Sequence, residues 1–319
     1  MILPDYAIEA RGLVKTYAKT KTTPAKLALN GIDLQIPRGS IFGLLGPNGA
    51  GKSTFINILA GLVRKSSGTV RIWDRDIDQR PRDARACIGV VAQEIAADVF
   101  FTPRESLEVQ AGLYGVPRRE RHTLEILSAL GLGDKADAYV RQLSGGMKRR
   151  LMVAKAMVHN PPVLILDEPT AGVDVELRRQ LWDYVVGLNR LGVTILLTTH
   201  YLEEAEELCD IIAIVNHGEV VACEPTSQLL KHLDTRAVVI TPGEPLAAAP
   251  SLPPFETRLR PTGELAISFK THEASVEQVL AAARDAGVHI RDLRTEEPDL
   301  EDVFLALTYG ADAARVSVP

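Results

Sequence analysis

The stretch GPNGAGKST, residues 46–54, has the residue types and spacing of a phosphate-binding loop. It follows the apolar run 41–45 and matches the pattern G-x-x-x-x-G-K-[ST]. Glycines allow backbone N–H groups to converge on phosphate oxygens, Lys52 adds a positive charge, and the Ser53 hydroxyl can ligate Mg²⁺. A helix that begins near Lys52 would direct its positive end at the same anion. The predicted nucleotide-binding residues are Gly46, Pro47, Asn48, Gly49, Ala50, Gly51, Lys52, Ser53 and Thr54.

Two acids stand at the end of a second apolar run, in VLILDEPT, residues 163–170. Asp167 suits the ordering of Mg²⁺ and its water shell, and Glu168 can orient or deprotonate an attacking water. The same acids could instead cap a helix that has Pro169 in its first turn. The phosphate-binding loop favours the functional interpretation, which predicts Mg²⁺-dependent hydrolysis of a nucleoside triphosphate.

A second glycine-containing stretch, LSGGMKRR, occupies residues 143–150. Ser144, Gly145 and Gly146 can present a hydroxyl and backbone N–H groups at the start of a helix. One triphosphate does not need two such cradles within one chain. The stretch resembles the signature of ATP-binding cassette (ABC) transporter ATPases. In that family the second cradle closes on the γ-phosphate of the other subunit's ATP, so the resemblance implies a head-to-tail dimer of two copies.

Four further residues match motifs of the same family. Tyr17, in LVKTY, resembles the aromatic residue that stacks on adenine, and Gln93, in VVAQE, resembles the glutamine that contacts the metal and the attacking water. Asp174, in AGVD, resembles the aspartate at the dimer interface, and His200, in LLTTH, resembles the switch histidine near the γ-phosphate. The catalytic residues implied are Glu168, His200 and Gln93, and the metal ligands implied are Ser53, Gln93 and Asp167.

The sequence departs from the family pattern at two places. Met147 occupies the position at which many ABC proteins have glutamine, while Ser144 and both neighbouring glycines remain. We therefore expect the contact with an anion to survive. The stretch AKTKTTPAKLAL, residues 18–29, is longer than usual, and its length bears on where Tyr17 lies relative to the base.

Three stretches narrow the resemblance to one subfamily: LSGGMKRRL, TTHYLEEAE and the closing EPDLEDVFLALT. They are similar to the ATPase subunit of bacterial ABC-2 type exporters, over nearly the whole chain. The resemblance implies a motor subunit that uses ATP and Mg²⁺, drives a separate transmembrane permease and lies peripherally on the cytoplasmic face of the bacterial inner membrane. Two alternatives remain: an importer ATPase, whose site residues look the same, and a soluble ABC ATPase acting in translation or DNA repair.

Composition limits the classes of function. The chain has 319 residues, 46% hydrophobic and 24% charged, as in ordinary globular proteins. Its net charge of -5 gives no global attraction to nucleic acid, and we expect no nucleic-acid partner. The longest apolar runs, around residues 163–166 and 193–197, fall far short of the roughly 20 residues that a membrane span needs. Any membrane role is therefore expected to come through a partner.

Residues 6–234 are predicted to form an α/β ATPase domain of the P-loop type. Apolar runs alternate with helical patterns there, which indicates a mostly parallel sheet covered by helices. The runs 41–45 and 163–166 are nearly continuous, as expected for strands buried on both faces. Helix-forming residues dominate from about 94 to 160, so we expect a helical subdomain inserted between strands.

A small α+β domain is predicted for residues 235–309, followed by a flexible tail at 310–319. Its proline-rich segment, 241–256, cannot continue regular structure for long. Alternation of apolar and other residues over 265–270 predicts a strand, and helical spacing over 276–283 predicts a helix. Residues 288–290 are expected to form another strand.

Overall fold

A computed structural model describes residues 3–19, 24–93, 98–171, 173, 175–232, 235–270 and 272–310. Asp174, the first residues of the predicted helical subdomain (94–97) and residues 311–319 of the predicted tail lie outside this description.

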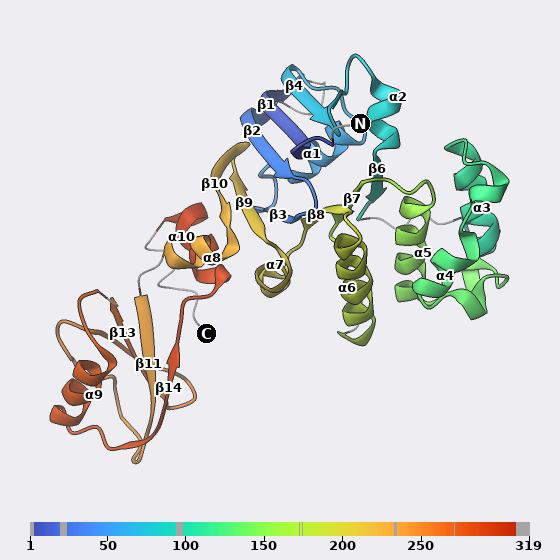
Figure 1. Ribbon diagram of the computed structural model, residues 1–319. Coiled ribbons are helices and arrows are strands. Elements are labelled where there is room, and N and C mark those ends of the chain that lie inside the picture. The colour runs from blue at the N-terminus through green and yellow to red at the C-terminus, as the bar shows by residue number, and fades with distance from the viewer. Residues whose placement is uncertain are drawn as a thin grey trace. The chain divides into compact units, whose positions relative to one another are not determined.

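The chain divides into two compact units, Met1–Thr226 and Ser227–Pro319 (Figure 1). The sequence suggested a division after residue 234. The short helices between these two positions, α8 (Thr226–Leu229) and the 3-10 helix η4 (Leu230–His232), explain the difference. The second of them packs against α10 (Leu300–Tyr309), so it belongs with the C-terminal residues.

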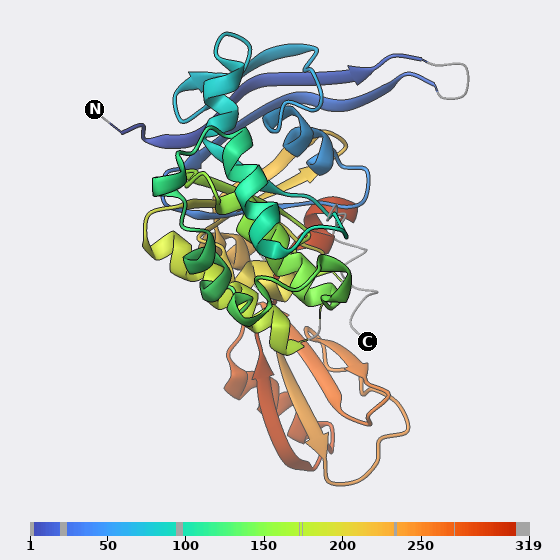
Figure 2. The same cartoon turned by 90° about the vertical axis from the view of Figure 1, so that its right-hand side faces the viewer.

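The first unit begins with an antiparallel four-stranded sheet that the sequence did not predict. Its strands, in spatial order, are β2 (Lys26–Pro37), β1 (Tyr6–Tyr17), β4 (Ser67–Ile72) and β5 (Arg75–Asp76). The long pair β1 and β2 is clearest in Figure 2. Alternate residues of both strands, such as Ile8, Leu34 and Ile36, are buried, so one face of this sheet belongs to the core.

The second sheet of this unit has six strands and carries the predicted site. Its strands, in spatial order, are β10 (Glu219–Pro225), β9 (Ile211–Asn216), β3 (Ile41–Leu45), β8 (Thr194–Thr198), β7 (Val163–Asp167) and β6 (Ile88–Val91). All neighbours from β9 to β6 are parallel, and β10 is antiparallel to β9. Because both faces are covered, β3 and β8 are buried along their whole length, as the apolar run 41–45 predicted.

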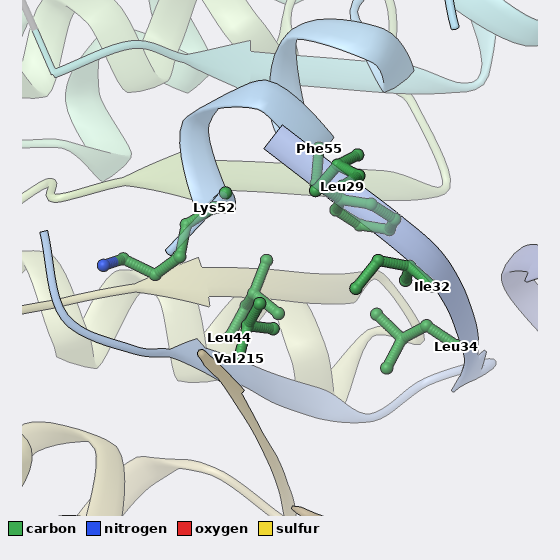
Figure 3. Close-up of a pocket in the computed structure, with 8 residues that line it drawn as sticks. Leu29, Ile32, Leu34, Leu44, Lys52, Phe55 and Val215 are labelled. Atoms are coloured by element: carbon green, nitrogen blue, oxygen red, sulfur yellow. The ribbon is translucent and has the colours of Figure 1, made fainter. Parts of the chain in front are cut away.

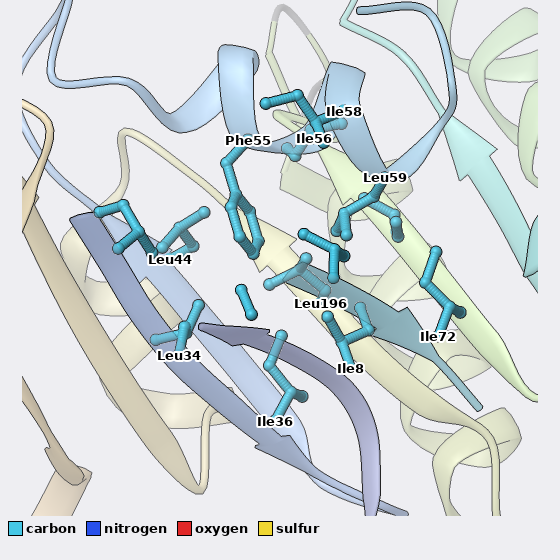
Figure 4. Close-up of a cluster of buried hydrophobic side chains, with 14 of the residues drawn as sticks. Ile8, Leu34, Ile36, Leu44, Phe55, Ile56, Ile58, Leu59, Ile72 and Leu196 are labelled. Atoms are coloured by element: carbon cyan, nitrogen blue, oxygen red, sulfur yellow. The ribbon is translucent and has the colours of Figure 1, made fainter. Parts of the chain in front are cut away.

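Helix α1 (Lys52–Leu59) fixes the end of the phosphate-binding loop by packing against strands of both sheets. Phe55, Ile56 and Leu59 point from the helix into one hydrophobic cluster that also holds Leu44 and Leu196 (Figure 4). The cluster extends to the buried face of the antiparallel sheet. Burial of a side chain such as Phe55 contributes roughly 2–3 kcal/mol, so the start of α1 is held firmly.

The described residues between β6 and β7 form helices and no strand, in agreement with the predicted helical insertion. The helices are α3 (Pro103–Leu113), α4 (Thr123–Ala129) and α5 (Gly145–Met157), with three short 3-10 helices between them. They pack on one another, and α5 also packs on β6. Thr102 and Glu105 form a capping box at the start of α3. The remaining helices of this unit are α2 (Pro81–Ala86), α6 (Val175–Arg190) and α7 (Leu202–Leu208).

The second unit is an antiparallel sheet with a helix, α9 (Val276–Asp285), packed against it. The strands, in spatial order, are β12 (Glu256–Leu259), β13 (Leu265–Lys270), β11 (Thr235–Pro242) and β14 (Ile290–Glu296). The predicted strand over 265–270 and the predicted helix are present. The proline-rich segment lies mainly in the connection between β11 and β12.

The strand predicted for residues 288–290 was wrong in its position, because β14 begins only at Ile290. Gly287 takes a φ of 80° after α9, and the N–H of Val288 donates to the carbonyl of Ala283 at 3.0 Å. This is the hydrogen bond with which a helix commonly closes its C-terminal end. Val288 therefore completes the helix before the chain enters the sheet.

Candidate active site

The phosphate-binding loop connects β3 to α1, as its sequence predicted. Gly46 and Gly51 have φ angles of 154° and 117°, and the protein leaves no room for a side chain at either position. A Cβ at Gly46 would lie 2.1 Å from the carbonyl oxygen of Val215, and one at Gly51 would lie 2.6 Å from that of Ala28. These two glycines are therefore required by the close approach of the protein's own backbone.

Lys52 places a buried positive charge at this loop. Its side chain is 8% exposed, and its Nζ donates to the carbonyl oxygens of Gly46 and Pro47. Burial lowers the pKa of Lys52, and the carboxylates of Glu168 and Asp167 partly offset that effect. Figure 3 shows the ammonium directed away from the apolar side chains that line the neighbouring pocket. A buried ammonium whose hydrogen-bond partners among the described residues are carbonyl oxygens fits the binding of a phosphate anion.

Tyr17 lies beside the loop, although the connection after it is long. Its hydroxyl is 3.5 Å from Oγ1 of Thr54, and the Nζ of Lys15 lies 4.8 Å from the centre of its ring. The strand register pairs Tyr17 with Lys26, whose Nζ is 3.8 Å from the position that a Cβ at Gly49 would take. Sequence patterns did not indicate Lys26, because its place depends on the register of β1 and β2.

Asp167 is the last residue of β7 and Glu168 follows it directly, but no helix begins at Pro169. The next helix, α6, starts at Val175, so the alternative in which the two acids cap a helix is wrong. Oδ1 of Asp167 accepts a hydrogen bond from Oγ1 of Thr198 at 2.6 Å. Glu168 has a φ of 49°, and its N–H donates to the carbonyl oxygen of Thr198 at 3.1 Å.

Glu168 joins the three predicted catalytic residues into one network. Its Oε2 accepts from Nε2 of Gln93 at 2.7 Å, and its Oε1 lies 2.6 Å from Nε2 of His200. The three residues follow β6, β7 and β8, which are neighbours in the parallel sheet. Carboxyl ends of such strands share one edge, where ligands of open α/β sheets bind. Glu168 is 9% exposed, whereas the side chain of His200 is about half exposed.

A buried carboxylate, Glu204, ties together the segments around this network. Its Oε2 accepts from Oγ1 of Thr170 at 3.0 Å and from Oγ1 of Thr199 at 2.9 Å. Its Oε1 forms an ion pair with Nε of Arg178 at 3.3 Å, and the guanidinium of Arg178 lies 4.2 Å from the centre of the Tyr201 ring. The sequence analysis missed this role, since the partners of Glu204 lie on three different segments.

The signature residues form a helix start of their own. Ser144 is the N-cap of α5, and its Oγ accepts from the N–H of Met147 at 3.2 Å. An added Cβ at Gly145 would meet no atom within 4 Å, so the space in front of it is open. Within the described part of the chain, no hydrogen bond joins Ser144, Gly145 or Gly146 to residues 46–54. The two predicted cradles are therefore separate within one chain.

Comparison with known proteins agrees with this geometry. Residues 29–171 match the family described as ABC transporter. The chain belongs to the ABC transporter family, since similarity to members extends over almost its whole length. It is 36% identical to the daunorubicin/doxorubicin resistance ATP-binding protein DrrA of Streptomyces peucetius, over 96% of this chain and 93% of that protein. It is 37% identical to a Nod factor export ATP-binding protein I of Rhizobium sp. (strain N33), over 95% and 97% of the two chains.

Solved structures show the same fold. A dimeric, post-hydrolysis structure of the ATP-binding cassette MJ0796, bound to ADP and Pi, matches with a TM-score of 0.61 and 28% identity, over 69% of this chain and 98% of that one. A Clostridium perfringens cbiO1 structure, part of the ABC transporter complex cbiONQ, matches with a TM-score of 0.64 and 28% identity, over 72% and 92%. The chain is thus an ATPase with the P-loop ABC fold. The expectation that it is an ATP-binding subunit of the ABC-2 exporter type is confirmed. Among the described residues, no helix has the length and apolar character of a membrane span.

Proposed function

We propose that two copies of this chain hydrolyse Mg²⁺–ATP at their shared interface and so drive outward transport through a separate transmembrane permease. The observation that carries the proposal is the network of Gln93, Glu168 and His200 at one edge of the sheet. The names of the relatives, which refer to drug resistance and to Nod factor export, support export as the direction of transport.

In this proposal Lys52 and the backbone of the phosphate-binding loop hold the outer phosphates of ATP, and Tyr17 stacks on the base. Mg²⁺ would be held by oxygen atoms of Ser53, Asp167 and Gln93, the type of ligand that this ion prefers. When bound, the ion neutralises charge on the phosphates. The Gln93–Glu168 hydrogen bond uses the amide nitrogen of Gln93, which leaves the amide oxygen for a metal.

Glu168 would orient the attacking water and accept its proton. Both of its carboxylate oxygens have partners, Gln93 on one side and His200 on the other. Those two side chains are the ones assigned to the metal and to the γ-phosphate. ATP binding would therefore exchange the partners of Glu168 and free a carboxylate oxygen for the water.

The second copy would complete each site through its signature residues. Open space in front of Gly145, and the separation of Ser144 from its own phosphate-binding loop, support a ligand that comes from another chain. The dimeric MJ0796 cassette supports the same arrangement. We assign Ser144, Gly145 and Gly146 to the partner's γ-phosphate and Asp174 to the dimer interface.

An exposed apolar surface in the helical insertion is the proposed contact with the permease. Phe100 and Leu113 are 74% and 77% exposed, and Val99, Val109 and Tyr114 are also exposed. These residues lie in α3, at its end and in the segment before it, which follows Gln93 in the chain. Large apolar side chains exposed on one segment are consistent with an interaction site. Docking there would place the chain at the cytoplasmic face of the inner membrane.

The substitution Glu168→Gln tests the catalytic assignment. It keeps the shape and both neighbours of the side chain but removes the base, so we expect steady-state ATP turnover to fall by at least about a hundredfold. ATP binding should remain, and size-exclusion chromatography with ATP should show an accumulated dimer. Glu207→Gln, at an exposed position of α7, is the matched control and should keep full activity. Undiminished hydrolysis in Glu168→Gln would remove Glu168 from its role.

A further inference from the structure

Arg149 is a buried cation that the proposed mechanism does not use. It lies on α5, the helix that Ser144 caps, and it is 3% exposed. Its Nη1 donates to the carbonyl oxygen of Ala92 at 2.8 Å, and its Nη2 donates to that of Glu168 at 3.2 Å. Its Nε has no hydrogen-bond partner in the described part of the chain.

Such a set of partners is unusual for a buried guanidinium. Buried arginines are normally paired with carboxylates, because removing an unpaired charge from water is costly. No ion pair to a carboxylate is found for Arg149 among the described residues, although Asp167 and Glu168 are close enough to act on its charge. Its Nη1 and Nη2 donate to two main-chain carbonyls instead.

The two carbonyls belong to the backbone of the catalytic network. Ala92 immediately precedes Gln93, and the second carbonyl is that of Glu168 itself. The side chains of Gln93 and Glu168 are in turn joined by the 2.7 Å hydrogen bond. The guanidinium bonds and the side-chain hydrogen bond therefore form a closed ring that includes Gln93 and Glu168. This ring fixes the distance between β6 and β7 at this point.

Arg149 also supports an uncommon backbone conformation. Glu168 has a φ of 49°, a left-handed conformation that costs free energy for a residue with a side chain. Its peptide groups are held on both sides, by the N–H bond to Thr198 and by the Arg149 bond to its carbonyl. This conformation directs the carboxylate between Gln93 and His200.

We propose that Arg149 is a positioning residue for ATP hydrolysis, which couples helix α5 to the geometry of Gln93 and Glu168. The inference rests on the proposed roles of those two residues and of Ser144. Ser144 lies five residues before Arg149, about 7.5 Å along the helix. A shift of α5 when Ser144 engages the partner's ATP would therefore reach Glu168 in the same chain. Arg149 then links one ATP site of the dimer to the other.

The test compares Arg149→Lys and Arg149→Gln with wild type and with Glu168→Gln, all as the full chain. Lysine keeps the charge but cannot reach both carbonyls as a planar fork does. We expect kcat to fall about tenfold in Arg149→Lys and further in Arg149→Gln. The KM for ATP and the affinity for a fluorescent ATP analogue should change less than about twofold, because Lys52 and residues 46–54 are untouched. The Hill coefficient for ATP should fall toward one.

Lys155→Gln is the control, since it removes a charge from the same helix without a contact to Ala92 or Glu168. If both Arg149 variants keep wild-type kcat while Glu168→Gln is inactive, the inference fails and the proposed function stands. If Glu168→Gln remains active, the proposed function itself fails. If Arg149→Lys loses nucleotide affinity or melting temperature in step with turnover, or does not fold, Arg149 only supports the fold and the inference is overturned.

Discussion

Two regions of the chain, the nucleotide site and the sheet of the second unit, treat their charges in opposite ways. At the nucleotide site the buried Lys52 and Arg149 have carbonyl oxygens as hydrogen-bond partners. In the second unit, Glu264 and Arg294 form a charged pair and Glu296 and Arg260 another, with Arg294 also bonded to Glu296. The first arrangement leaves charges to be completed by a ligand, whereas the second is complete in itself.

The pKa shifts show the same difference through their causes. Burial is the main cause at Lys52 and lowers its pKa, so the folded chain disfavours the charge there. At Glu264 the hydrogen bond from Arg294 is the main cause, and it lowers the pKa to about 2. A site that binds an anion thus carries strain from unpaired charge, while the sheet of the second unit gains register and order from paired charge.

The largest effect that this comparison predicts is at Lys52. Lys52→Met should lower ATP turnover by at least about a hundredfold, because the outer phosphates lose their cation. Thermal stability should stay equal or rise, since a poorly paired buried charge is replaced by an apolar side chain of similar size. ATPase assays and thermal melts without nucleotide check both parts. A marked fall in melting temperature would show that the charge stabilises the fold, against the comparison.

The next effect concerns Glu204, a buried carboxylate near the site that two hydroxyl groups and Arg178 contact. Glu204→Ala should lower the free energy of unfolding by about 3 kcal/mol, because Thr170 and Thr199 lose their acceptor and Arg178 loses its ion-pair partner. Chemical denaturation measures this loss, and Glu207→Ala at an exposed position serves as the control. A loss no greater than that of the control would contradict the structural role of Glu204.

A smaller effect is expected at Tyr17, where affinity rather than stability should respond. Tyr17→Ala should weaken ATP binding about tenfold, because a stacked aromatic face is lost. Tyr17→Phe keeps the ring and gives up only the 3.5 Å contact to Thr54, so it should bind within about twofold of wild type. Titration with a fluorescent ATP analogue distinguishes the two. Equal weakening in both variants would mean that the hydroxyl, not the ring, makes the contribution.

The smallest effect belongs to the exposed charges of the second unit. The folded pKa of Glu264 is lowered to about 2, so its contribution to stability is present above its ordinary pKa of about 4.5 and is lost as pH falls toward 2. Glu264→Gln should therefore be slightly less stable than wild type at pH 6, with a difference that shrinks below pH 4.5. Urea denaturation across that range measures it. A difference that does not change with pH would exclude the ion pair as its source.

How far the sequence predicted the molecule depended on the range of each interaction. The phosphate-binding loop and the buried strand at 41–45 could be predicted because a local pattern determines them. The antiparallel sheet of β1, β2, β4 and β5 was missed because it depends on pairing between distant segments. Residues 288–290 were assigned to a strand because their apolar pattern hides the helix-closing bond of Val288.

For the candidate site as well, residues within a local motif could be predicted and residues held by distant contacts could not. Glu168, Gln93 and His200 each belong to a recognisable motif, and the structure brings them together. Arg149 and Glu204 could not be found in this way, because their partners lie on separate segments and only the folded chain brings them together. Single residues that hold a motif in place leave little trace when one sequence is read by itself.

The way in which the helical insertion is attached to the sheet has a mechanical consequence. The helical insertion leaves the sheet after Val91 and returns at Val163, on strands β6 and β7 that are hydrogen-bonded neighbours. Because these strands are parallel and Val163 pairs with Ile88, the chain leaves at one end of the strand pair and returns at the other. The insertion is therefore anchored at both ends of this strand pair, and the hydrogen bonds of Arg149 on α5 to the carbonyls of Ala92 and Glu168 add a third attachment at the end where the catalytic network lies.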